Sequence, residues 1–462
     1  MNKFYCYALI SALTGCTTYN DKSNAFVNKW RSGDIEASYN GYSKLAKKAN
    51  NKDKVIFNLE AGTTARAMGN YQVSNENYTI AQDVADDYES KARIKVGSET
   101  AAMFSNLATL PYRGSIMDKI MLDTYQGMNY WEIGDLEKAR VEFNSLMQKQ
   151  NEAQVQLEKI SRDEYTYNNR DQIEKAKEDY KLKNQINETQ SLISELVGYD
   201  DFMNPYSEFI YGLFFMYNPQ DNSDYDRGLK AMQRVNSLIG GNKLIAANVA
   251  EINDILSGNG EVLNSTHIVF ETGTAPKRTQ TRIDVPLFAV SKKVPYVGAA
   301  FPKLEPNDNY EDSLTCVSND NSYDALEIAS FDRMISAEFK KQLPTVITKT
   351  ILATVVKGVA AYVAQEAARR QAQESGNNMI YLFTVIGTTV WQVAVNNADL
   401  RTWNTLPKKV MYTKFETPSN KMIEIKLGEE NYPVSLEGKS NLVLIKSNNK
   451  GLIPTIRTLV LK

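Results

Sequence analysis

Histidine and cysteine are almost absent from this chain of 462 residues, which holds one histidine and three cysteines. Catalytic devices that pair a serine or cysteine nucleophile with a base need a histidine, and His267 lies at the edge of an expected strand, where we interpret it as structural. Zinc sites need clusters of Cys and His, which the sequence lacks. Gly258-Asn259-Gly260 has no Lys-Ser/Thr after it, so it is no phosphate loop. We therefore expect no enzyme activity, no cofactor and no metal.

The chain also lacks a large excess of charge of one sign, since it has 53 Lys and Arg and 55 Asp and Glu, for a net charge of −2. This balance excludes the basic footprint of a nucleic-acid-binding protein. The apolar run at the start of the chain, Phe4 to Leu13, is too short to span a bilayer.

Leu13-Thr14-Gly15-Cys16 follows the apolar run and the positive Lys3, in the pattern of a bacterial lipobox. In such signals the cysteine thiol is acylated with a diacylglycerol, the chain is cut just before the cysteine, and the new amine is acylated too. We predict a signal peptide at 1–15, lipidation of Cys16 and a tether over 16–25. Thr17 in place of Asp favours the outer membrane, facing the periplasm. Cys6 leaves with the signal, so only Cys316 remains, and no intramolecular disulfide is expected.

Three segments between 26 and 240 share one spacing: a glycine at a turn, a small residue five positions later and an aromatic residue nine positions later. They are Gly33 with Ser38 and Tyr42, Gly69 with Ser74 and Tyr78, and Gly134 with Ala139 and Phe143. Gly127, seven residues before Gly134, provides close packing on the preceding helix. A period near 34 residues predicts tetratricopeptide-like helical hairpins. Such arrays bind partners in a groove, for which Tyr42, Tyr78, Tyr125, Tyr130 and Trp131 are candidates.

Lys149 to Leu196 is rich in charge and predicts long helices, interpreted either as a solvated spacer or as a coiled-coil partner site. From 241 to 462 short β-rich runs predict an antiparallel β-sandwich-like domain, with a helical insertion over 325–398. Within it, small residues of 351–368 and the uncharged run 379–395 predict a hairpin. This hairpin is open to three interpretations: core helices, self-association or membrane insertion. The overall fold class is α+β.

Asp399, Arg401 and Trp403 form the best local cluster, just before Pro407. We interpret them as an ion pair that fixes the entry to a strand and an indole that fills the core, with a polar-aromatic binding patch as the alternative. The loop 272–281, with Lys277 and Arg278, is expected to be exposed.

Three stretches resemble a family of bacterial outer-membrane lipoproteins with tetratricopeptide-like repeats and no established activity. They are Tyr125 to Trp131 with Gly134-Asp135, Phe270 to Lys277, and Ala398 to Pro407. Leu400 stands where the family usually has Thr. The resemblance implies an envelope role linked with cell-wall synthesis through activators of penicillin-binding proteins.

Together these features predict a lipid-anchored adaptor that binds a protein partner of the cell envelope. A self-assembling homo-oligomer built on the 351–395 hairpin is the second hypothesis, and a glycan-active enzyme with paired carboxylates is the third.

Overall fold

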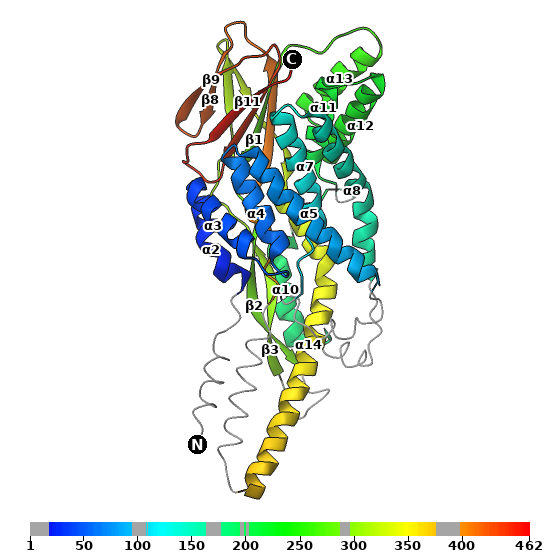
Figure 1. Cartoon of the computed structure of the whole chain (residues 1–462), viewed down its shortest axis with the longest axis vertical. Coiled ribbons are helices and arrows are strands. Elements are labelled where there is room, and N and C mark those ends of the chain that lie inside the picture. The colour runs from blue at the N-terminus through cyan, green and yellow to red at the C-terminus, as the bar shows by residue number, and fades with distance from the viewer. Residues whose placement is uncertain are drawn as a thin grey trace.

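The computed structural model describes residues 18–94, 108, 110–162, 177–194, 198–199, 203–286, 296–375 and 398–462. It shows a mixed α+β protein in which a helical body packs beside a sheet assembly (Figure 1). The signal peptide, Cys16, and the expected second hairpin helix at 379–395 lie outside the described residues.

Helical hairpins build the first half of the chain. Its helices are α2 (Tyr19–Arg31), α3 (Ile35–Lys48), α4 (Lys54–Ala67), α5 (Tyr71–Ile94), α7 (Ile116–Glu132), α8 (Leu136–Arg162), α10 (Tyr180–Ser194), α11 (Pro205–Tyr217), α12 (Asn222–Leu238) and α13 (Lys243–Leu256). Because α13 is helical, the helical part continues past the boundary expected at 240. The charged stretch from 149 divides between α8 and α10, with 163–176 outside the described residues.

The turns of three hairpins use the glycines that the spacing singles out. Gly33, Gly69 and Gly134 have φ between +77° and +80°, a conformation that L side chains rarely adopt. Gly127 lies against a neighbouring ring, because a Cβ there would stand 2.6 Å from the ring of Phe143. A small residue on one helix thus admits an aromatic side chain from the next.

The predicted tether over 16–25 is wrong for residues 18 to 25. Helix α2 begins at Tyr19, and the hydroxyl of Thr18 accepts a hydrogen bond from the backbone N–H of Asp21 at 3.2 Å. The Asp21 carboxylate in turn accepts from the Thr18 backbone N–H at 2.8 Å. This capping box fixes the start of the helix, so only Thr17 lies between Cys16 and the capping residue Thr18.

Within the described residues, the strands form three sheets. They are β1 (Ser265–Thr272), β2 (Lys277–Pro286), β3 (Tyr296–Glu305), β4 (Thr315–Ser318), β5 (Asn321–Asp324), β6 (Leu326–Ser330), β7 (Lys409–Glu416), β8 (Met422–Leu427), β9 (Glu430–Ser435), β10 (Asn441–Ser447) and β11 (Thr455–Val460). Their order is β11-β10-β1-β7-β6 in the largest sheet, β5-β4-β8-β9 in the second and β2-β3 in the third.

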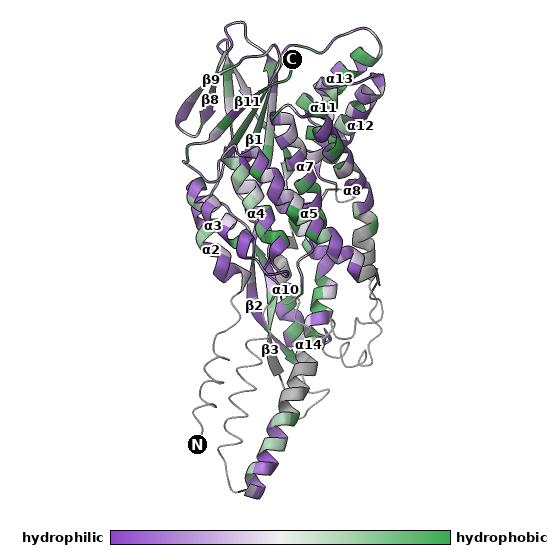
Figure 2. Ribbon diagram, in the orientation of Figure 1, coloured by the Kyte–Doolittle hydropathy of each residue, from purple (hydrophilic) through white to green (hydrophobic). Residues whose placement is uncertain are grey.

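The expected all-antiparallel domain needs correction at two points. β1 pairs with β10 in parallel, with Thr266 opposite Asn441, so the largest sheet is mixed. The β-rich runs before residue 297 do not all join it, because β2 and β3 form a separate hairpin. An apolar cluster that includes Phe270, Ile425 and Val443 fills the space between the two larger sheets, and Figure 2 shows both apolar and hydrophilic residues along these strands.

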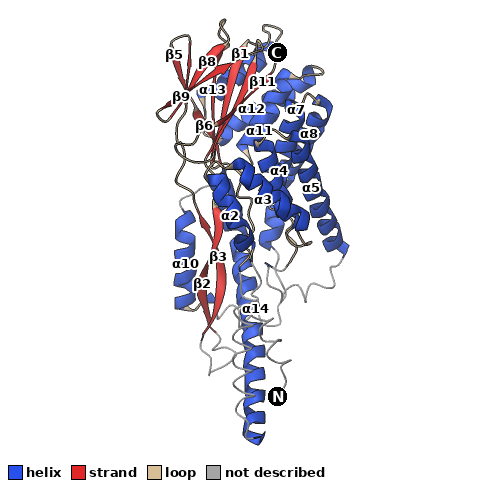
Figure 3. Ribbon diagram, turned by 60° about the vertical axis from the view of Figure 1, so that its left-hand side comes forward, coloured by secondary structure: helices blue, strands red, loops and turns tan. Residues whose placement is uncertain are grey.

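The helical insertion expected over 325–398 begins with strand β6 and then forms one helix, α14 (Phe331–Ser375), which continues through Pro344. Its 45 residues make it about 68 Å long. Helices α10 and α14 pack against β2 and β3, and these four elements extend beyond the body toward one end of the molecule (Figures 1 and 3). Among the described residues, we find no helix with the length and apolar character needed to cross a membrane.

Candidate functional site

The junction between the helical body and the sheets is built on a buried carboxylate. Glu60 of α4 is fully buried and accepts hydrogen bonds from the Tyr19 hydroxyl at 2.7 Å, the Thr405 hydroxyl at 2.7 Å and the Asn404 backbone N–H at 2.8 Å. Burial raises the pKa of Glu60 to about 6, against the lowering effect of these hydrogen bonds. One side chain of α4 thereby fixes both α2 and the segment before β7.

The cluster predicted from the sequence lies in the same segment. Arg401 is 3% exposed and forms a two-bond ion pair with Asp399, at 2.8 and 2.6 Å. Its remaining N–H groups donate to the backbone oxygens of Lys52 and Leu110 at 2.7 and 2.8 Å. Arg401 therefore joins three segments that are far apart in the sequence, and its place is that of a structural residue.

Trp403 is buried between the helices. Its indole N–H donates to the hydroxyls of Thr63 and Thr405 at 2.9 and 3.0 Å. The ring meets the rings of Tyr78 and Tyr125 edge-on, at centroid distances of 5.8 and 6.1 Å. Tyr78 and Tyr125 of the hairpins therefore face the segment that leads into the sheet domain.

The partner groove expected along these aromatic residues is not an open surface. Tyr42, Tyr78, Tyr125, Trp131 and Phe143 are at most 3% exposed, and Ala139 is fully buried. Tyr130 is half-buried beneath the Lys138 ammonium. These positions pack helices together, because a fully buried ring cannot contact a partner without unfolding its surroundings.

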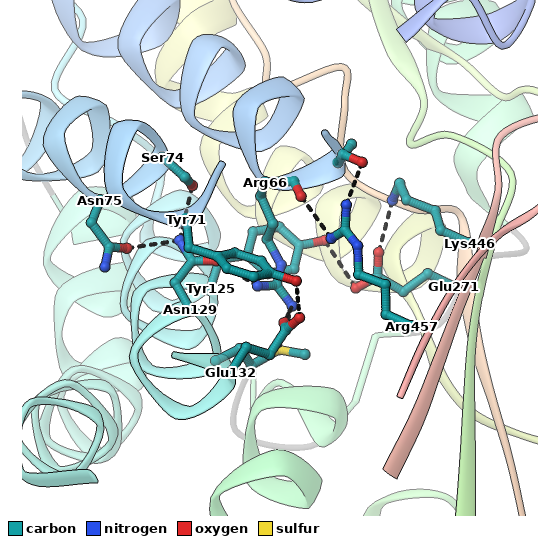
Figure 4. Close-up of polar contacts among 12 residues, drawn as sticks. Arg66, Tyr71, Ser74, Asn75, Tyr125, Asn129, Glu132, Glu271, Lys446 and Arg457 are labelled. Atoms are coloured by element: carbon teal, nitrogen blue, oxygen red, sulfur yellow. Dashed lines mark hydrogen bonds and ion pairs between the residues drawn. The ribbon is translucent and has the colours of Figure 1, made fainter. Parts of the chain in front are cut away.

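A pocket lies between the ends of α4 and α7 and strands β1, β10 and β11. Figure 4 shows the side chains of Arg66 and Tyr125 on its helical side and those of Glu271, Lys446 and Arg457 on its sheet side. Its volume is about 50 Å³, which is room for about four water molecules. The lining carries three cationic side chains and one carboxylate.

Each charge of the pocket is positioned by a second group. Arg66 pairs with Glu132 at 2.6 Å, and Lys446 pairs with Glu271 at 2.7 Å. Burial opposes ionisation of Glu271, but the Lys446 ammonium, the Arg66 guanidinium and the Tyr206 hydroxyl together outweigh it and bring the pKa of Glu271 below its ordinary value. The hydroxyls of Tyr206 and Tyr125 donate to the same carboxylate at 2.9 and 3.2 Å.

Arg457 supplies the excess positive charge. Its guanidinium donates to the backbone oxygen of Arg66 at 2.7 Å and to that of Ala67, the last carbonyls of α4. It also lies over the ring of Tyr71, 5.4 Å from its centroid. Among the ion pairs of the described residues Arg457 has no carboxylate partner. The pocket is therefore suited to a negatively charged group.

His267 and Cys316 have the side-chain types most often used in catalysis, and both are buried in structural positions. The ring nitrogens of His267 each lie 2.8 Å from a tyrosine hydroxyl, of Tyr217 and of Tyr412. Burial keeps the pKa of His267 well below its ordinary value, so the imidazole is neutral. Cys316 is buried on β4, and burial raises the pKa of its thiol to about 12. The described residues contain no cluster of His, Cys, Asp and Glu able to hold a metal ion.

No motif in the sequence marks Glu60, Arg66, Glu271, Lys446 or Arg457. One signal was available for the first two, since they are charged residues in α4, a helix that is buried on nearly every face. A charge in such a helix needs a partner in the interior. The last three come from strands whose neighbours only the sheet topology defines.

Comparison with family models, with curated proteins and with solved structures finds no match to this chain. The resemblance to outer-membrane lipoproteins therefore stays a prediction.

Glu60 predicts a measurable pH dependence of stability. Its pKa in the folded protein, about 6, lies above the ordinary value of 4.5, so the folded state holds the proton more tightly between these values. The stabilisation is complete below pH 4.5 and is lost as the pH rises through 6, by about 2 kcal/mol. Chemical denaturation across pH 4.5 to 7 measures the slope of the free energy of unfolding against pH. This slope should differ between the wild type and Glu60→Gln. The exposed Glu36→Gln should keep the wild-type slope, and equal slopes for Glu60→Gln and wild type would contradict the assignment.

Proposed function

We propose that this protein is a lipid-anchored adaptor of the bacterial outer membrane that holds a protein partner at the periplasmic face, with a role in cell-wall synthesis. The lipobox at Leu13 to Cys16 supports the anchor. The glycine turns and small-to-aromatic contacts support a tetratricopeptide-like array, and the apolar cluster between the two larger sheets supports a sandwich-like second domain.

The observation that carries the binding role is the pocket of Arg66, Lys446 and Arg457. It lies where two parts of the fold meet, which is a common place for binding sites. A carboxylate of a partner, from an acidic side chain or a chain end, would meet three cations and one fixed anion there. The surrounding tyrosines are preorganised by hydrogen bonds to Glu271, so little side-chain entropy is lost on binding.

A charge placed in the pocket tests this proposal. Thr455→Glu adds a carboxylate to the lining, where it should repel an acidic group and lower partner recovery about tenfold, or 1.4 kcal/mol. Thr458→Glu is the matched control, because Thr458 is exposed and does not line the pocket. Crosslinking in living cells followed by affinity capture from solubilised membranes measures the recovery.

We expect a stoichiometric protein from the wild type and from Thr458→Glu, and loss of it from Thr455→Glu. Recovery of the bait alone from wild-type cells would refute the adaptor function. Equal recovery of the partner from both variants would show that the partner binds at a surface other than the pocket.

A further inference from the structure

Along the molecule, the start of α2 lies at the same level as the start of β2 and the early part of α14. The side-chain amide of Asn20 donates to the backbone oxygen of Arg278 at 3.0 Å. The Arg278 guanidinium lies over the ring of Phe339, 5.5 Å from its centroid. These contacts mark the level at which the chain leaves the lipid anchor of the proposed function, on which this inference rests.

The four elements α10, β2, β3 and α14, here named the rod, extend past that level. From Phe339 to Ser375 the helix α14 continues for about 54 Å. From Arg278 to Pro286 strand β2 continues for about 26 Å. Figures 1 and 3, two views turned by 60°, both show these elements running away from α2 and from the two larger sheets.

The tether is too short to lift the rod from a membrane. Thr18 is the second residue after Cys16, which gives the tether a reach of at most about 7 Å. A lipid on Cys16 would thus place the start of α2 at the membrane surface. Because the rod is several times longer than this reach, it must lie along the surface or enter the bilayer.

The charge of the rod decides between these arrangements. Lys and Arg outnumber Asp and Glu by 13 to 7 in the rod, against 53 to 55 in the whole chain. The remainder is therefore acidic, with a net charge of −8 against +6. Along α14 charged residues continue to Arg369, Arg370 and Glu374, and each would be costly at the centre of a bilayer. Figure 2 shows hydrophilic and apolar residues alternating along the described end of this helix.

We infer that the rod is a membrane-docking element that lies on the surface of an anionic phospholipid leaflet. Its net positive charge meets the lipid phosphates, and the acidic remainder of the protein is directed away from them. Lipid anchor and rod are two attachments to one membrane, so the body and its pocket keep a fixed orientation above the surface.

Vesicle binding tests the charge of the rod without the lipid. The full chain with Cys16→Ser should sediment with vesicles of phosphatidylcholine and phosphatidylglycerol at low salt, and not with pure phosphatidylcholine. Arg369→Glu with Arg370→Glu, at two exposed positions of α14, should weaken this binding by roughly tenfold or more. Lys47→Glu with Lys48→Glu makes the same charge change at exposed positions of α3 and should leave binding unchanged. Absence of binding to the anionic vesicles, or equal loss in both double variants, would overturn the inference.

Energy transfer tests the orientation with the lipidated protein. A fluorophore at Gln373→Cys, exposed on α14, should transfer to a dye on the lipid headgroups at least twice as efficiently as one at Asn259→Cys, exposed after α13. Weak transfer from both positions in a protein that stays vesicle-bound would overturn the inference that the rod docks on the membrane. The proposed adaptor function would not be affected by that result. Transfer between copies at position 373, with none to lipid, would assign the rod to self-association and also overturn it.

Discussion

Cys16→Ser is expected to abolish incorporation of labelled palmitate and to release the protein into the soluble fraction at physiological salt. The lipobox places the acyl chains on this residue, and each buried CH₂ contributes about 0.8 kcal/mol to membrane attachment. Without them only the charge of the rod remains, which salt screens. The loss should therefore be nearly complete.

Labelling of cells followed by fractionation measures this effect. Cys316→Ser is the matched control, because that thiol is buried in the sheet domain and should leave labelling unchanged. Palmitate on the Cys16→Ser protein, or a soluble wild type that keeps residues 1–15, would contradict the anchor and with it the proposed compartment.

Trp403→Ala is expected to lower the free energy of unfolding by about 3–5 kcal/mol. The indole is 1% exposed and contacts the rings of Tyr78 and Tyr125, so its removal leaves a cavity between α5, α7 and the strand entry. The hydroxyls of Thr63 and Thr405 also lose their donor. These ring contacts and hydrogen bonds lie at the junction, so their loss weakens the packing of the helical body against the sheets.

Denaturant unfolding followed by tryptophan fluorescence and circular dichroism measures this cost. Trp403→Phe keeps most of the ring contacts and should cost about 1–2 kcal/mol. Val460→Ala, at a side chain that is 45% exposed, should change stability by less than about 0.5 kcal/mol. A Trp403→Ala protein within 1 kcal/mol of wild type would show that the indole does not hold the junction.

The helical hairpins were the most predictable part of the fold. Their signals are local: a glycine that needs positive φ, and a small residue four positions before an aromatic one. The same local signals misplaced the function of the rings, since spacing shows which face a residue occupies and not what covers that face. Here Trp403, from the segment that leads into the sheet domain, covers Tyr78 and Tyr125, and Phe214 of α11 covers Trp131 and Phe143.

The pocket could not be predicted from the sequence. Arg66, Glu271 and Arg457 are separated by some two hundred residues each, and they meet because β1 pairs in parallel with β10, whose other neighbour is β11. Parallel pairing needs a long crossover and leaves no turn signal in the sequence. The short tether was missed for a different reason, since the capping box of Thr18 and Asp21 is a readable motif that the weak apolar pattern of α2 concealed.

By itself, the sequence determined an α+β protein with glycine-turn hairpins, β-rich runs after residue 264 and near-neutral charge, because these depend on local backbone preference and composition. Only the tertiary structure decided that the aromatic residues are interior, that three cations meet at one pocket and that basic residues gather in the rod. Such features depend on contacts between distant segments, and the free energy of those contacts is absent from any local stretch of the chain.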